Sequence, residues 1–143
     1  MQHASAGKLG QSAHMLGRTS RHWWGVVLDA PDPHALARFY ADLMDWKIVK
    51  DEHNFVGVAP LGEHVEYIAF QRATAYEPPA WPAQPGRQQM MLHLDIEVPD
   101  LDAAVAAAQR AGARLADFQP QETVRVLLDP AGHPFCLYVD PDA

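Results

Sequence analysis

The chain has a single cysteine, Cys136, among its 143 residues. One cysteine excludes an intramolecular disulfide, so a reducing compartment is the default expectation. Long apolar runs are also missing. No stretch approaches the ~20 apolar residues of a transmembrane helix, and the N-terminal residues lack the apolar segment of a signal peptide. We therefore expect a cytoplasmic protein that does not enter a membrane.

Positive charge is scarce. Lys and Arg number 11 against 18 Asp and Glu, which gives a formal net charge of −7. Nucleic acids and anionic membranes both demand a basic surface, so neither is expected as a partner. The sequence also has no Gly-rich phosphate loop, no G-x-S-x-G motif and no paired Cys motif. Hydrophobic residues make up 48% of the chain, which is enough to form a core.

Hydrophobic patterning predicts two units of strand, helix and three strands within a single domain over residues 22–143. Residues 1–21 are polar and read as a flexible extension. The first unit occupies 22–73, with a helix that Asp32 caps and Pro33 begins. The second occupies 90–143, with a helix over 101–111 that Gly112 ends. The predicted strands are 23–30, 46–50, 54–59 and 65–73, then 90–98, 114–117, 123–128 and 135–139.

Residues 74–89 join the two units and include four prolines and a glycine. These residues forbid regular structure, so the segment is a linker. It is either a stiff connector or a loop that lays Trp81 or Arg87 over a pocket.

The two units form an internal repeat. Residues 24–32 and 92–100 share a strand, a Pro-Asp pair and the start of an Ala-rich helix, at an offset of 68 residues. Two copies of β-α-β-β-β are therefore indicated by pattern alone. Neither copy is large enough to bury its sheet face by itself, so the halves should pack together or across a dimer.

Three segments in order carry a resemblance to a known family. They are the stretch from Val27 to Trp46, the later H-L-D-I-E-V-P-D-L-D-A-A-V, and D-P-A-G-H-P-F near the end. The chain resembles the vicinal-oxygen-chelate superfamily (the glyoxalase, bleomycin-resistance and dioxygenase group), and within it the bacterial glyoxalase-like domain branch. The resemblance implies an α+β fold in which two tandem βαβββ modules form a curved mixed β-sheet cleft with the helices on the outside. It also implies a homodimer.

In metal-using members the ligands come from the first and last strand of each module. These positions fall here on Gly25, His93 and Cys136. On the last strand of the first module two registers are open: either Tyr67, Ala69 and Gln71 face the cleft, or Glu66 and Ile68 do. Only His93 matches a family ligand, so no metal or other cofactor is expected, with a divalent metal as the alternative.

Alternation along the strand predicted at 90–98 places His93, Asp95 and Glu97 on one face, and the repeat adds Asp29 to it. Carboxylates beside a histidine can transfer protons or bind a cationic ligand. His93, Asp95 and Glu97 are therefore the catalytic candidates. For His133, in the D-P-A-G-H turn, a structural role is expected. The ligand-binding candidates are Asp29, Gln71, Trp81, Arg87, His93 and Asp95.

Three functions follow as hypotheses. The first is a protein that binds a small organic molecule in the cleft without an essential metal. The second is a metal-dependent lyase, isomerase or dioxygenase of the glyoxalase type that uses His93. The third is a metal-free enzyme with Asp95 or Glu97 as an acid or base. The fold alone does not choose among them, because this scaffold hosts many chemistries.

Overall fold

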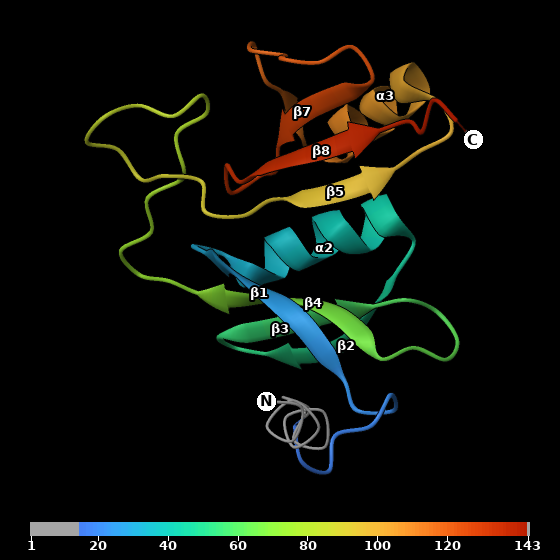
Figure 1. The fold of residues 1–143 in the computed structure, drawn as a ribbon. Coiled ribbons are helices and arrows are strands. Elements are labelled where there is room, and N and C mark those ends of the chain that lie inside the picture. The colour runs from blue at the N-terminus through green and yellow to red at the C-terminus, as the bar shows by residue number, and fades with distance from the viewer. Residues whose placement is uncertain (1–14, 143) are drawn as a thin grey trace, which may run out of the picture.

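The computed structural model describes residues 15–142, which form two βαβββ modules in tandem (Figure 1). Residues 1–14 of the predicted extension lie outside the described part. The first module contains β1 (Trp24–Ala30), α2 (Pro33–Met44), β2 (Lys47–Glu52), β3 (Phe55–Ala59) and β4 (Glu66–Arg72). The second contains β5 (Leu94–Glu97), α3 (Leu101–Ala111), β6 (Arg114–Leu115), β7 (Val124–Leu128) and β8 (Pro134–Tyr138).

Each module builds its own four-stranded mixed sheet, and the two sheets have the same topology. The strand orders are β1-β4-β3-β2 and β5-β8-β7-β6. In each sheet the first strand of the module runs parallel to the last, and the other pairs are antiparallel. The internal repeat and the predicted α+β class are therefore confirmed.

Capping residues mark the start of both helices and the end of α3. The Asp32 carboxylate accepts hydrogen bonds from the backbone N–H groups of His34 and Ala35 at the start of α2. Asp100 caps α3 in the same way through the N–H of Ala103. Gly112 follows α3 with a φ of 124°, a conformation that favours glycine.

One hydrophobic core joins the modules. Helix α2 packs on the first sheet and α3 on the second, and the two helices touch each other. Phe39 and Tyr40 of α2 contact Phe135 of β8, with ring centroids 5.9 and 6.0 Å apart. Each such side chain contributes about 1.5–3 kcal/mol when fully buried. The modules therefore share their stability, as their small size requires.

The sheet faces turned away from the helices carry the candidate site residues. On β1, Leu28 and Ala30 lie in the core, so Val27 and Asp29 point the other way. On β4, Ile68 and Phe70 pack in the core. Of the two registers left open by the sequence, the structure therefore has the one with Tyr67, Ala69 and Gln71 on the opposite face.

The strand predicted over 90–98 is wrong at its N-terminal end, because β5 begins only at Leu94. Its partner β8 begins at Pro134, and the first paired residues are Leu94 and Phe135. Before that point the chain has no parallel neighbour, and the side chain of Met91 is 87% exposed. His93 therefore lies just before the strand rather than within it. The strand predicted over 114–117 likewise shortens to two residues. None of the helices within residues 15–142 is long and apolar enough to cross a membrane.

Candidate functional site

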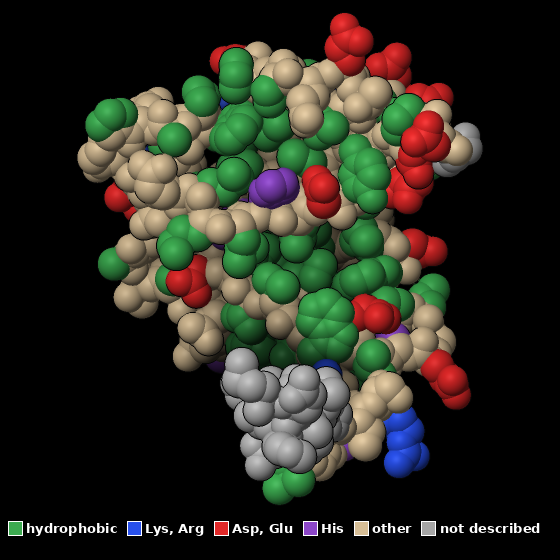
Figure 2. Space-filling view, viewed as in Figure 1, with side chains coloured by type: hydrophobic (Ala, Val, Ile, Leu, Met, Phe, Trp, Pro, Cys, Tyr) green, Lys and Arg blue, Asp and Glu red, His purple; other side chains and the backbone are tan. Residues whose placement is uncertain are grey.

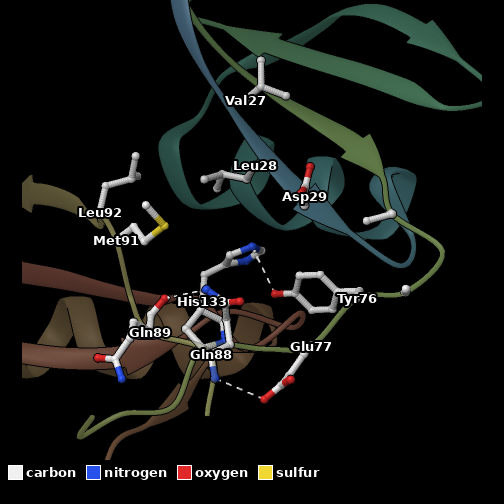
Figure 3. A pocket seen from close by; sticks show the side chains of 13 residues that line it. Val27, Leu28, Asp29, Tyr76, Glu77, Gln88, Gln89, Met91, Leu92 and His133 are labelled. Carbon is white, nitrogen blue, oxygen red and sulfur yellow. Dashed lines mark hydrogen bonds between the residues drawn. The ribbon is translucent and has the colours of Figure 1, made fainter. Parts of the chain in front are cut away.

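A pocket of about 380 Å³ opens between the two modules, and we call it the inter-module pocket (Figure 3). Three separate parts of the chain form it: the end of β1, both ends of the connection between the modules, and the turn before β8. Leu28, Met91 and Leu92 give it an apolar wall, while Asp29, Tyr76 and His133 supply polar groups. A pocket that combines an apolar wall with a few convergent polar groups is the usual form of a small-molecule site.

A chain of hydrogen bonds runs inward from this pocket. The Tyr76 hydroxyl lies 3.1 Å from Nε2 of His133, whose Nδ1 lies 2.8 Å from a carboxylate oxygen of Asp129. The same oxygen accepts a 2.8 Å hydrogen bond from the hydroxyl of Tyr40. Asp129 is 4% exposed and Tyr40 is fully buried. These hydrogen bonds thus connect residues 74–89, the turn before β8 and helix α2.

The D-P-A-G-H turn explains why Asp129 holds this position. Its other carboxylate oxygen accepts hydrogen bonds from the backbone N–H groups of Ala131 and His133. An aspartate that bonds backbone groups two and four residues ahead is a common way of closing such a turn. Gly132 makes the turn possible with a φ of 92°. The turn therefore positions His133 at the pocket.

The two tyrosines of this hydrogen-bond network, Tyr40 and Tyr76, stay protonated at neutral pH. Burial raises the pKa of Tyr76, and the nearby negative charges of Asp129 and Asp29 raise it further. Burial is also the main cause that raises the pKa of Tyr40, followed by the charge of Asp129. Tyr76 therefore offers the pocket a neutral hydroxyl rather than a phenolate.

A second group of candidate residues gathers on the second module. Ligand atoms of His93, Asp95 and Cys136 lie within 4.8 Å of one another, and His93 Nε2 is 3.8 Å from the carboxylate of Asp95. Asp95 and Cys136 are paired neighbours on β5 and β8. Burial raises the pKa of the Cys136 thiol to about 11, with Asp95 as the second cause. The cysteine is thus a neutral thiol at neutral pH.

The residues present do not fit the four-ligand metal site of the family. Gly25 has no ligating atom, and the ring and carbonyl oxygen of Tyr67 occupy the space where a side chain at this position would begin. The first module therefore provides no ligand at this position. On the second module a neutral thiol stands beside His93, and a thiol does not suit the hard, oxygen-binding ions.

Asp29, His93 and Glu97, which the sequence predicts on one face of a cleft, line three different hollows. Asp29 lines the inter-module pocket, whereas His93 borders a smaller hollow together with Trp81 and Cys136. Glu97 lines a third hollow together with Val98 and Asp140. Asp29 and Glu97 are thus equivalent in the repeat but lie in different sites.

Of the remaining ligand-binding candidates, the two in the linker have different environments. The indole N–H of Trp81 donates to the carbonyl of Phe118, 3.3 Å away, which holds the ring near the second sheet. Arg87 forms a 3.0 Å ion pair with Glu77 and does not line the inter-module pocket. Gln71 is exposed next to Asp29 on the neighbouring strand.

Sequence reasoning missed Tyr76 as a site residue and assigned His133 only a structural role. The D-P-A-G-H motif was visible, but nothing in it shows that the histidine ring faces a pocket. Tyr76 had no signal beyond its position at the start of a proline-rich linker.

Comparisons with known proteins agree with this geometry. The family model described as "Glyoxalase-like domain" matches residues 25–138. A search of curated proteins found no match. Among solved structures, a glyoxalase/bleomycin resistance protein/dioxygenase family enzyme from Burkholderia phytofirmans PsJN is similar, with a TM-score of 0.60 and 22% identity over 80% of this chain and 95% of that one.

Two further structures illustrate the range of the fold. A glyoxalase-related enzyme from Fulvimarina pelagi has a TM-score of 0.58 at 18% identity, covering 88% of this chain and 90% of that one. The antibiotic binding protein TnmS3 from Streptomyces sp. CB03234 has a TM-score of 0.55 at 19% identity, covering 88% of this chain and 98% of that one. With a family model that spans both modules, the chain belongs to the glyoxalase-like domain family of the vicinal-oxygen-chelate superfamily.

Proposed function

We propose that this chain binds a small organic molecule in the inter-module pocket and needs no metal to do so. The observation that carries the proposal is the pocket itself, whose lining combines the apolar side chains of Leu28, Met91 and Leu92 with the polar groups of Asp29 and Tyr76. A volume of about 380 Å³ suits a ligand of modest size. The poor match of Gly25 and Cys136 to a metal site supports the second half of the proposal.

The antibiotic binding protein among the similar structures supports the same reading, because it shows that this fold can serve for binding. At 19% identity the similarity extends to the fold alone. The identity of the ligand therefore has to come from the pocket of this chain.

Titration calorimetry with probes that carry a phenyl ring (benzylammonium, benzyl alcohol and benzoate) tests the proposal. At least one probe should bind saturably, with the same Kd before and after treatment with EDTA. Ala75→Phe places a bulky ring at the pocket lining and should weaken binding. Ala83→Phe adds the same ring to the same linker at a residue that does not line the pocket, and should leave binding unchanged. Binding that requires a metal, or no binding by any probe, would reject the proposal.

A metal-dependent lyase, isomerase or dioxygenase is the second candidate function. It is favoured by the grouping of His93, Asp95 and Cys136 within 4.8 Å. Elemental analysis of the purified protein separates the two candidates. The enzyme reading expects one ion per chain, lost in His93→Ala; a metal-free protein, or metal content that His93→Ala leaves unchanged, contradicts it.

We further propose that the chain forms a homodimer. Large apolar side chains remain exposed on and beside β1 and β5: Trp23 is 49% exposed, Val27 44% and Leu92 57%. Contiguous exposed apolar surface often marks a protein interface. Figure 2 shows hydrophobic side chains along the face between the two sheets. Sedimentation velocity should give twice the chain mass; a monomer at micromolar concentration would exclude the dimer.

A further inference from the structure

The inner end of the inter-module pocket offers no hydrogen-bond donor, whatever the charge of His133. If the imidazole is neutral, its Nδ1 proton goes to Asp129, and the single proton of Tyr76 is shared between His133 Nε2 at 3.1 Å and the carbonyl of Ala131 at 2.9 Å. If the imidazole is protonated, its Nε2 proton goes to the Tyr76 oxygen, and Tyr76 still donates to Ala131. In both cases a lone pair of the Tyr76 oxygen is available to a ligand, and no proton is.

The glutamines of the pocket lining show the same bias. The side-chain amide nitrogen of Gln88 donates to the carbonyl of Gln89 at 2.9 Å, and that of Gln89 donates to the carbonyl of Gln84 at 3.5 Å. One N–H group of each amide is therefore used by the backbone, and both amide oxygens have no donor partner within the described part of the chain. Amide oxygens left in this way are acceptors.

The charge in the pocket is negative and uncompensated. The Asp29 carboxylate lines the pocket, and no described side chain forms a hydrogen bond or ion pair with it. The other carboxylate of the lining, Glu77, already accepts from Arg87 and from the backbone N–H of Gln88. No Lys or Arg is among the described residues that line the pocket. Asp29 is thus an anion without a partner among the described residues, in the same pocket lining as Tyr76 and the two glutamines (Figure 3).

We infer that the inter-module pocket selects an organic cation that carries N–H donors, with a primary ammonium group on Asp29 and Tyr76 and an apolar body against Met91 and Leu92. This inference rests on the proposed binding function and adds the chemical class of the ligand. An ammonium group brings three donors for these acceptor oxygens, and a positive charge to a lining in which no described residue is Lys or Arg.

Four probes that share one phenyl ring separate charge from hydrogen bonding, measured by titration calorimetry at constant ionic strength. Benzylammonium has both the positive charge and the N–H groups, and benzyltrimethylammonium has the positive charge alone. Benzyl alcohol is neutral and has a hydroxyl in place of the ammonium group. Benzoate has a negative charge. Benzylammonium should bind tightest and benzoate weakest. Benzyltrimethylammonium should fall below benzylammonium, because it cannot donate to Tyr76 or the glutamine oxygens.

Two variants assign the effect to named groups. Asp29→Asn should weaken benzylammonium binding about fivefold, the size expected of a partly exposed ion pair, and leave benzyl alcohol unchanged. Glu63→Gln removes the same charge from an exposed loop position outside the pocket lining and should change neither. Tyr76→Phe should weaken benzylammonium but not benzyltrimethylammonium.

The probes also separate this inference from the proposed function. If benzyl alcohol or benzoate binds as tightly as benzylammonium, the pocket binds small molecules but the cation inference is wrong. Equal binding of the two cations would overturn the donor argument and with it the inference. If none of the four probes binds, both proposals are rejected.

Discussion

Tyr40 and Asp129 are 89 residues apart in the chain, and the buried hydroxyl of Tyr40 donates a 2.8 Å hydrogen bond to the Asp129 carboxylate. The contact joins the helix of the first module to the turn before the last strand of the second. The Asp129 carboxylate also accepts hydrogen bonds from two backbone N–H groups of its own turn and lies 2.8 Å from Nδ1 of His133. The arrangement of the turn at the pocket thus depends on a residue in the other module.

Tyr40→Phe is expected to destabilise the protein. The substitution removes a buried hydrogen bond to a charged group, which is worth about 1.5–3 kcal/mol. Guanidinium unfolding followed by circular dichroism should show a free energy of unfolding lower by this amount. Tyr138→Phe is the control, because its hydroxyl forms no hydrogen bond in the part of the chain described and its loss should cost less than about 0.5 kcal/mol. Equal stability of the two variants would contradict the prediction.

Gly25→Ala is expected to destabilise the fold without creating any ligand. The added Cβ would clash with the carbonyl oxygen of Tyr67, which belongs to the backbone and cannot rotate away as a side chain can. Relieving such a contact requires the strands to shift, at a cost of about 1–3 kcal/mol.

Gly57→Ala is the matched control for this prediction. Gly57 also lies within a strand of the first sheet, but its nearest neighbours would be 3.7 Å or more from an added Cβ. That distance is ordinary contact, and alanine is favoured over glycine in a strand by roughly 0.5–1 kcal/mol. Thermal melts should therefore show Gly25→Ala below the parent chain and Gly57→Ala at or above it. The opposite order would mean that Tyr67 does not restrict position 25.

The elements could be predicted from the sequence because their signals are local. Asp32 and Asp100 stand immediately before the helices that they cap, and Gly112 stands where α3 ends. The repeat at an offset of 68 residues then indicated the pairing of two equal modules. The start of β5 was predicted wrongly because alternation continues through 90–93, although no partner strand lies beside it. Alternation reports side-chain direction, whereas a strand also requires a neighbour.

The pocket could not be predicted, because its groups come from distant segments. Tyr76, His133 and Asp29 meet only when the connection between the modules folds back against β1 and the turn before β8. Asp29 and Glu97 are equivalent in the repeat, yet the two modules surround them differently. A repeat therefore predicts the sheets that carry a residue better than the site to which it belongs.

Cys136 allows the last prediction, which concerns pH. Its pKa is raised from 9.0 to about 11, first by burial and then by the charge and hydrogen bond of Asp95. The folded chain therefore holds the thiol proton more tightly than the unfolded chain. Because the unfolded thiol already ionises near pH 9, the stability that this proton gives is present below pH 9 and is lost as the pH rises towards 11.

Alkylation by iodoacetamide reports the thiolate directly, since Cys136 is the chain's single cysteine. The rate, followed by mass spectrometry, should keep rising beyond pH 9 instead of levelling there. Asp95→Asn removes the second cause of the shift, so the rate should level at a lower pH. Glu97→Gln, two residues further along β5 and paired with Tyr138 rather than Cys136, should leave the profile unchanged. A profile that levels near pH 9 in the parent chain would show that the thiol is neither buried nor influenced by Asp95.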